Sequence, residues 1–441
     1  MNLDSEISPR PNGWALLPLS TFFLLYLLTY IFTGDLSKMP VSVVFLTTSI
    51  VAILSSKGGK LSARIDLFCK GSANKTIMLM IMIFILAGAF AGTAKAMGAV
   101  DATVTMVLYL LPQNMIMASI FVAACFISMS MGTSCGTIAA LAPIAVGISA
   151  QTGISLPAML GIVVGGAMFG DNLSFISDTT IVATRTQDCE MQDKFKVNIW
   201  IVLPAAILVF LIYVYQGFTL SSGTPAVVNS VEWLKVIPYL AVLVAALAGV
   251  NVIIVLLIGI VLSGFFGLLA GGFTVWNWTA AMGSGIVNDM GELIIVSLLA
   301  GGMFEMVRIN GGIDWLIIKL TQNIRTKRKA EATIAALVSI TGFFTANNTI
   351  SLIIIGPIAK KISDNFELDK RKVASLLDTF SCFVQGLIPY GAQLLIASGL
   401  AGINPLDILP FLYYPFLMGI TAMLAIIFRY PRLPVSSKSN Q

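Results

Sequence analysis

The chain has 441 residues, of which 57% are apolar and 11% are charged, and its formal net charge is +5. Soluble domains carry about 25% charged residues, so this chain has too little charge to cover a water-facing surface. Together with a mean hydropathy of +0.92, this composition excludes a soluble enzyme, a disordered chain and a nucleic-acid binder, and it indicates a polytopic membrane protein. Histidine is absent, so any proton transfer would depend on carboxylates.

Apolar runs predict the membrane helices, because most of them approach the roughly 17–25 residues that a spanning helix needs. Residues 130–150 and 346–363 are also apolar but are interrupted by Gly, Asn, Ser, Thr and Pro, which favours re-entrant hairpins. The first run is preceded by only one basic residue and is interpreted as an uncleaved helix. In chain order the runs lie near 14–33, 41–55, 76–98, 103–128, 157–184, 197–216, 234–250, 252–271, 290–307, 331–345, 373–399 and 408–428.

Basic residues between the runs indicate the cytoplasmic side of the membrane. The segments 57–75 and 325–329 and the tail from Arg429 are therefore expected to be cytoplasmic. The stretch 360–372 is also basic, yet it adjoins a hairpin that we expect on the outer side. Orientation is thus in conflict at this one place.

The sequence shows an internal repeat with one constant spacing between corresponding positions. Residues 143–149 resemble 357–363, and at the same spacing Gly88 corresponds to Gly302. The basic segment 57–75 corresponds to a segment without Lys or Arg, as inverted repeats predict. Chance similarity among apolar helices is the alternative.

Inversion requires an odd number of crossings in each repeat, whereas the apolar runs divide into six and six. One run is therefore misassigned, and we expect the error in the pair 234–250 and 252–271. We expect a first repeat at 1–220 with its hairpin near 130–150, and a second repeat at 221–441 with its hairpin near 346–363.

A polar segment at 165–180 interrupts the fifth run. An Asp at the bilayer centre costs about 2.5–3.5 kcal/mol on insertion scales, so it is kept where it faces a cavity or a partner. The i, i+3, i+7 spacing of Asp171, Ser174 and Asp178 predicts one helical face, and Gly170 permits an unwound stretch. Oxygen ligands of this kind suit hard cations such as sodium, although a polar network that only packs helices is an alternative. The expected ligands are Asp171, Asn172, Ser174, Asp178 and Thr179.

The corresponding segment of the second half carries Asp378, Ser381 and Gln385 on one helical face, with Gln385 at the position of Asp171. Pro389 follows and predicts a discontinuous helix, unless this is a kinked structural helix. The two hairpin tips carry hydroxyl and amide groups that could close an ion site against the broken helices, or could form polar turns at the membrane surface. The expected tip ligands are Thr133, Ser134, Thr137, Asn347, Asn348, Thr349 and Ser351.

At these motifs the chain resembles the NhaC family of sodium/proton antiporters. The resemblance rests on GGAMFGDNLSFISDTT at 165–180, MGTSCGT at 131–137, and Asp378 with LIPYG at 387–391. It implies membership of the wider ion-transporter superfamily, a bacterial inner-membrane location and homodimers. The chain departs from the family motifs at Asn172 for Lys, Phe175 for Pro, Ile181 for Asn and Gly391 for Asn. The missing Lys is expected to leave the site more negative.

The expected fold is an all-α polytopic membrane protein with two inverted repeats, each containing a re-entrant hairpin and a broken transmembrane helix. We expect a secondary transporter, not an enzyme, that exchanges sodium for protons by alternating access. Asp171 or Asp178 would bind either ion but not both, and Asp171, Asp178 and Asn348 are the candidate sodium ligands. No cofactor is expected apart from the transported sodium and protons, and the expected partners are the lipid bilayer, a second copy of the chain and no nucleic acid.

An ion-coupled transporter of an amino acid or small carboxylate is the alternative function. In that case Arg185 could bind the organic anion while the same oxygen ligands hold a coupling ion. An intramembrane enzyme is disfavoured because the chain has no His, no paired Ser/Lys motif and no Cys constellation. A channel is disfavoured because broken helices in repeated halves are typical of transporters.

Overall fold

The computed structural model describes residues 11–33, 38–56, 59–174, 177–220, 232–248, 250–271, 274–322 and 324–431. Within these ranges every regular element is a helix, so the expected all-α class is confirmed. Six helices are long and apolar enough to cross a membrane, or up to eight if each of two bent pairs is one span. This number is smaller than the twelve apolar runs because several runs are broken or short.

The helices of the first half end with a long helix, α10. They are α1 (Leu17–Thr33), α2 (Val41–Ser55), α3 (Leu61–Ser72), α4 (Lys75–Ala96), α5 (Ala99–Leu110), α6 (Ile116–Met131), α7 (Ser134–Thr152), α8 (Leu156–Leu173), α9 (Asp178–Thr186) and α10 (Met191–Leu220).

The helices of the second half follow the undescribed residues 221–231, where the expected boundary between the two halves lies. They are α11 (Trp233–Leu247), α12 (Val252–Leu269), α13 (Val275–Ser284), α14 (Gly291–Ile309), α15 (Gly312–Thr321), α16 (Lys327–Thr345), α17 (Asn348–Asn365), α18 (Lys370–Gln385), α19 (Ala392–Ala401), α20 (Pro405–Ile408) and α21 (Tyr413–Ile427).

The runs 234–250 and 252–271, where we expected a misassignment, and the run 103–128 differ in how they fold. The first two runs are the separate helices α11 and α12, whereas 103–128 divides into α5 and α6. Pro112 causes this break, because a proline lacks an N–H and disfavours helical geometry in the residue before it. Leu111 accordingly adopts extended geometry, with φ −108° and ψ 134°.

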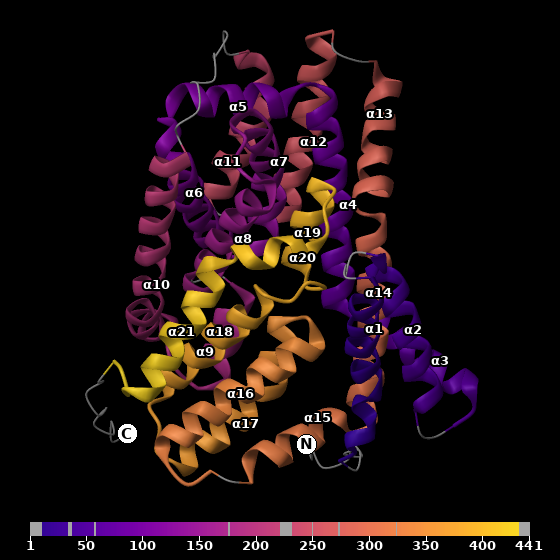
Figure 1. The fold of residues 1–441 in the computed structure, drawn as a ribbon, viewed down its shortest axis with the longest axis vertical. Coiled ribbons are helices and arrows are strands. Elements are labelled where there is room, and N and C mark those ends of the chain that lie inside the picture. Colours follow the sequence, from indigo (N-terminus) through magenta and orange to yellow (C-terminus); the bar gives the residue numbers. More distant parts are fainter. Residues whose placement is uncertain are drawn as a thin grey trace.

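Each expected hairpin segment is a single helix, the second arm of a helical hairpin whose first arm precedes it. Residues 130–150 fall mainly on α7, which follows α6 after a two-residue turn, and residues 346–363 fall mainly on α17, which follows α16 in the same way. The tips nevertheless lie where the polar motifs indicated. Figure 1 shows α6 and α7 in the upper half of the molecule and α16 and α17 in the lower half.

The basic stretches of the second half lie together at one end. Lys327 Nζ donates a hydrogen bond to the carbonyl of Glu367 at 3.1 Å and lies 3.6 Å from its carboxylate. This contact joins the basic segment 325–329 to the stretch 360–372, so both lie at the same end of the molecule and cannot face opposite sides of the membrane. The tail beyond residue 431 lies outside the described residues. Figure 1 shows α15 at this lower end and α5 across the opposite end.

Glycines bring α8 against α6 in the centre of the bundle. A Cβ at Gly166 would lie 2.6 Å from Ala124 Cβ, and one at Gly170 would overlap Ser128 Cβ. Small residues four apart let two helix backbones approach closely, which is how helices associate without a hydrophobic driving force in lipid. Because the two backbones are so close, the Ser128 hydroxyl donates a hydrogen bond to the carbonyl of Ala167 at 2.6 Å.

We expect Gly170→Ala to lower the free energy of unfolding by about 1–3 kcal/mol, because the added methyl group overpacks this contact. Denaturant titration in detergent micelles measures the change. Gly283→Ala is the matched control, since a Cβ there meets no atom within 4 Å, and it should be neutral or slightly stabilising because alanine favours the helix. Equal stabilities of the two variants would contradict the close packing of α6 on α8.

Candidate ion-binding site

The two hairpin tips and the two helix breaks meet at one small pocket of about 120 Å³. The breaks separate α8 from α9 and α18 from α19, as the broken helices expected from the sequence require. The N-termini of α7, α9, α17 and α19 converge on this pocket. Among its lining residues are Thr133, Ser134, Asp171, Ser177, Asp178, Thr179, Asn347, Asn348, Thr349, Gln385 and Gln393.

Asp171 is the buried carboxylate of the pocket, with 5% of its surface exposed. Ser134, the first residue of α7, donates to its Oδ2 at 2.7 Å, and Ser177, in the break after α8, donates to its Oδ1 at 2.6 Å. Two hydroxyl groups thus hold the carboxylate, and each hydroxyl oxygen keeps lone pairs that can bind a cation. Burial makes the net charge at this position costly unless a proton or a cation accompanies it.

Two glutamine side chains connect Asp171 to the second half of the chain. Gln385 Nε2 donates to Gln393 Oε1 at 2.8 Å and to the carbonyl of Ala346 at 3.0 Å. Gln393 Nε2 in turn donates to Ser134 Oγ at 2.9 Å. In the described part of the chain no donor reaches Gln385 Oε1, which is buried. This oxygen is therefore a free acceptor beside the pocket, in the segment that corresponds to Asp171.

Asp178 occupies a different environment from Asp171. It is the first residue of α9, is exposed, and lies where the helix dipole favours a negative charge. Beside it, the Thr179 hydroxyl lies 2.9 Å from that of Ser177. At the opposite tip, the Asn347 side chain accepts a hydrogen bond from Ile350 N at 2.9 Å and caps α17. The pocket therefore contains one buried and one exposed carboxylate.

Several expected ligands lie outside the pocket, with their hydroxyl groups bonded to backbone carbonyls. Thr137 donates to Thr133, Ser351 to Asn348, and Ser381 to Asp378, each to a residue close by in its own chain segment. Ser174 donates to the carbonyl of Met129 on α6 at 2.8 Å. Only the Ser174 hydrogen bond joins two elements, the end of α8 and α6, whereas the other three hydroxyl groups bond within their own segments.

The expected single face of Asp171, Ser174 and Asp178 was wrong. Helix α8 ends at Leu173, Ser174 is extended with φ −66° and ψ 140°, and α9 begins only at Asp178. The unwound stretch thus follows Asp171 instead of surrounding Gly170. Phe175, one of the departures from the family motif, lies outside the described residues.

Asp378 belongs to a separate buried cluster next to the pocket. It forms an ion pair with Lys194 of α10, and both side chains are almost fully buried. The Lys194 ammonium also donates to the carbonyl of Asn172 at 2.6 Å and to the Thr180 hydroxyl at 3.0 Å. An ammonium group from another helix thus binds the carbonyl of Asn172, where the family motif has a Lys, but its charge is paired with that of Asp378.

Sequence reasoning missed Lys194 and Asn198, the two residues that organise this cluster. Asn198 donates to the Asn172 side chain at 2.7 Å and accepts from Ser375 at 2.9 Å and from Thr379 at 2.8 Å. The available signal was their i, i+4 spacing at the start of a long apolar helix, which places both on one face. The i, i+4 spacing does not predict that Lys194 pairs with Asp378, which lies far away in the sequence.

The hairpin tips turn through left-handed residues, Gly132 with φ 68° and Ala346 with φ 47°. Glycine adopts this conformation without strain, whereas alanine is strained by roughly 1–2 kcal/mol. The carbonyl of strained Ala346 accepts the hydrogen bond from Gln385 described above. Backbone strain is thus located at a tip that lines the pocket.

We expect Gly132→Ala and Ala346→Gly to change stability in opposite directions. The first should lower the free energy of unfolding by about 1–2 kcal/mol because it introduces the strain. The second should raise it by up to about 1 kcal/mol, since the relieved strain exceeds the entropic cost of glycine. Unfolding of both variants in detergent measures the effect, and changes of the same sign would contradict the assigned tip geometry.

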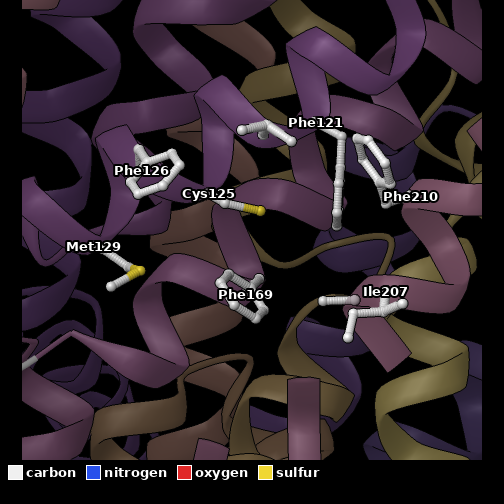
Figure 2. A pocket seen from close by; sticks show the side chains of 9 residues that line it. Phe121, Cys125, Phe126, Met129, Phe169, Ile207 and Phe210 are labelled. Carbon is white, nitrogen blue, oxygen red and sulfur yellow. The ribbon is translucent and has the colours of Figure 1, made fainter. Parts of the chain in front are cut away.

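A second cavity, of about 200 Å³, lies between α6, α8 and α10 and has a different character. Figure 2 shows the rings of Phe121, Phe126, Phe169 and Phe210 and the sulfur of Cys125 around it. Such a lining offers a cation no oxygen side chain. The cavity is therefore not a candidate ion site.

A polar pocket at the breaks of helices inside an apolar bundle is typical of the class of secondary membrane transporters. A family model described as "Na+/H+ antiporter family" matches residues 14–218 and 219–430. The chain belongs to this family of ion-transporting, multi-pass membrane proteins.

Individual relatives agree with this assignment. The chain is 24% identical to the Na(+)/H(+) antiporter NhaC of Bacillus subtilis, with 79% of this chain and 83% of that protein covered. It is also 24% identical to the Malate-2H(+)/Na(+)-lactate antiporter of the same organism, with 79% and 80% covered. The crystal structure of the Alcanivorax borkumensis YdaH transporter aligns with 96% of this chain and 100% of its own chain at a TM-score of 0.43 and 13% identity. The family model and the Bacillus subtilis antiporter NhaC show that the chain is a multi-pass bacterial membrane protein.

Proposed function

We propose that this protein exchanges sodium ions for protons across the bacterial inner membrane, and that both ions compete for the carboxylate of Asp171. The observation that carries this proposal is the position of Asp171: a buried carboxylate, held by two hydroxyl groups, at the meeting point of both hairpin tips and both helix breaks. Family membership supports sodium and protons as the exchanged ions.

Competition for one carboxylate couples the two fluxes. When protonated, Asp171 is neutral and excludes sodium; when ionised, it attracts a cation. The oxygens of Ser134 and Ser177 are within hydrogen-bond distance of Asp171, and Gln385 Oε1 is a free acceptor beside the same pocket. These groups supply the oxygen ligands that a hard cation needs. Asp178 and Asn348 line the same pocket, and we propose them as further sodium ligands.

Alternating access would follow from two inverted repeats packed around the pocket. Helices α7, α8 and α9 begin at residues 134, 156 and 178, and α17, α18 and α19 begin at 348, 370 and 392, which is the spacing of the sequence repeat. The corresponding helices α5 and α15 lie at opposite ends of the molecule (Figure 1). These correspondences support an inverted repeat, in which rocking of one repeat against the other opens the site to either side.

A transporter of a small organic anion is the second candidate. Within the described residues, the N-cap residues Thr133 of α7 and Ser177 of α9 make no side-chain capping hydrogen bond, and the N-cap of α19 is Gly391, which has no side chain. The N-terminal N–H groups of these helices are therefore available to bind a carboxylate, as helix N-termini do in other transporters. Arg185 is exposed in the last turn of α9 and is not among the residues that line the pocket. The alternative therefore rests on the helix N-termini.

Proton flux in proteoliposomes distinguishes the two candidates. An imposed pH gradient is read by an internal dye while sodium, lithium or potassium is added, followed by amino acids and organic acids. We expect sodium alone to dissipate the gradient. Flux only in the presence of an organic solute would overturn sodium/proton exchange in favour of the second candidate. The homodimer that the family resemblance implies is part of the proposal, and light scattering in detergent tests it.

A further inference from the structure

The ammonium group of Lys194 fills a site built entirely of oxygen atoms. An ammonium has three N–H donors. Here the three acceptors are the carboxylate of Asp378, the carbonyl of Asn172 at 2.6 Å and the hydroxyl of Thr180 at 3.0 Å. The exposed fractions of Lys194 and Asp378 are 1% and 0%, so the pair is shielded from bulk solvent.

Those three oxygens are also what a dehydrated alkali cation requires. A carboxylate, a backbone carbonyl and a hydroxyl group are hard oxygen ligands. The carbonyl is available because α8 ends at Leu173, where the last carbonyls of a helix have no partner within it and its dipole is negative. Three separate elements, α8, α9 and α18, supply one ligand each.

The positions that correspond to this ion pair in the other half of the chain carry no charge. The correspondence is the one that pairs Gly88 with Gly302. By it, Asp378 corresponds to Val164 and Lys194 to Ile408, and these two apolar side chains are fully buried. Well-packed apolar residues can replace a buried ion pair at no loss of stability. The fold alone therefore does not require a charge pair here, and the pair calls for a functional explanation.

We propose that Lys194 is a tethered cation that occupies a second cation site, formed by Asp378, the Asn172 carbonyl and Thr180. The first site is the pocket at Asp171, so this inference rests on the proposed sodium/proton exchange. The tethered ammonium satisfies the second site permanently and leaves one exchangeable site per chain. Without the ammonium, the same oxygens bind a free sodium ion.

Sodium binding to purified full-length protein tests this proposal. Wild type, Lys194→Met and Lys194→Met/Asp378→Asn are compared by equilibrium dialysis against radioactive sodium, with choline as the replacement cation. We expect Lys194→Met to bind one more sodium ion per chain than wild type, and its melting temperature to rise with sodium chloride but not with choline chloride. The double variant should bind the wild-type number.

The proposal would be overturned by a Lys194→Met variant that folds and binds only the wild-type number of sodium ions, or by one that stays unfolded equally in sodium and in choline. Extra sodium that persists in the double variant would also overturn it, because the ion would then bind elsewhere. The test is a difference in sodium binding from wild type, so it can succeed or fail independently of the proton-flux assay that tests sodium/proton exchange. Lys194→Ile/Asp378→Val is a folded reference that should bind the wild-type number.

Discussion

Asp171→Asn should reduce sodium-dependent proton flux to the level of protein-free liposomes. Asparagine has nearly the same shape and can still bond to Ser134 and Ser177, so the fold is expected to survive. The amide neither binds a proton at physiological pH nor supplies a negative charge to sodium, and both fluxes lose their shared site. The pH-gradient assay in proteoliposomes measures the loss, and size-exclusion chromatography checks the fold.

Asp101→Asn is the matched control for this experiment. Asp101 lies exposed in the first turn of α5, away from the pocket, so its variant should exchange ions at the wild-type rate. Normal exchange in Asp171→Asn would refute the assignment. If exchange were then lost in Asp178→Asn, the exposed carboxylate at the start of α9 would be the shared site instead.

The second large effect concerns stability at the buried ion pair. Asp378→Asn leaves the Lys194 ammonium buried without its counter-charge, and breaking a buried pair in this way costs about 3–5 kcal/mol. We expect a loss of that size in the free energy of unfolding, measured by denaturant titration in detergent. Lys194→Ile/Asp378→Val should unfold close to wild type, because the corresponding positions Ile408 and Val164 are buried and apolar.

An exposed ion pair provides the control for this prediction. Asp188 Oδ2 lies 2.5 Å from Lys360 Nζ, and their side chains are 56% and 38% exposed. The Lys360 hydrogen bond lowers the pKa of Asp188, but water screens such a pair, so Asp188→Asn should cost less than about 1 kcal/mol. If Asp378→Asn lowered the free energy of unfolding no more than Asp188→Asn does, the prediction would be wrong. The Lys194 ammonium would then not be left as an uncompensated buried charge.

The sequence by itself determined the all-helical class, the position of both hairpin tips and the break between α18 and α19, but it placed the first break near Gly170, before the actual end of α8 at Leu173. These features follow from local chemistry: apolar runs predict helices, while Gly132 and Pro389 mark places where a helix cannot continue. Asp171 was identifiable for the same reason, since a carboxylate inside an apolar run is costly without a function. The sequence also shows one constant spacing between similar segments of its two halves, and the internal repeat that this spacing suggests stays a prediction.

Only the tertiary structure decided which polar groups meet. Asp378 appeared equivalent to the pocket residues in sequence, yet it lies in a different cluster because α10 inserts Lys194 beside it. Gln393 was overlooked because its role depends on the distance to Ser134, 259 residues away. Whether a hydroxyl group faces a pocket or its own helix, as for Thr137 and Ser351, depends on neighbours from distant segments. Local sequence predicts where helices break, whereas long-range packing decides what each break faces.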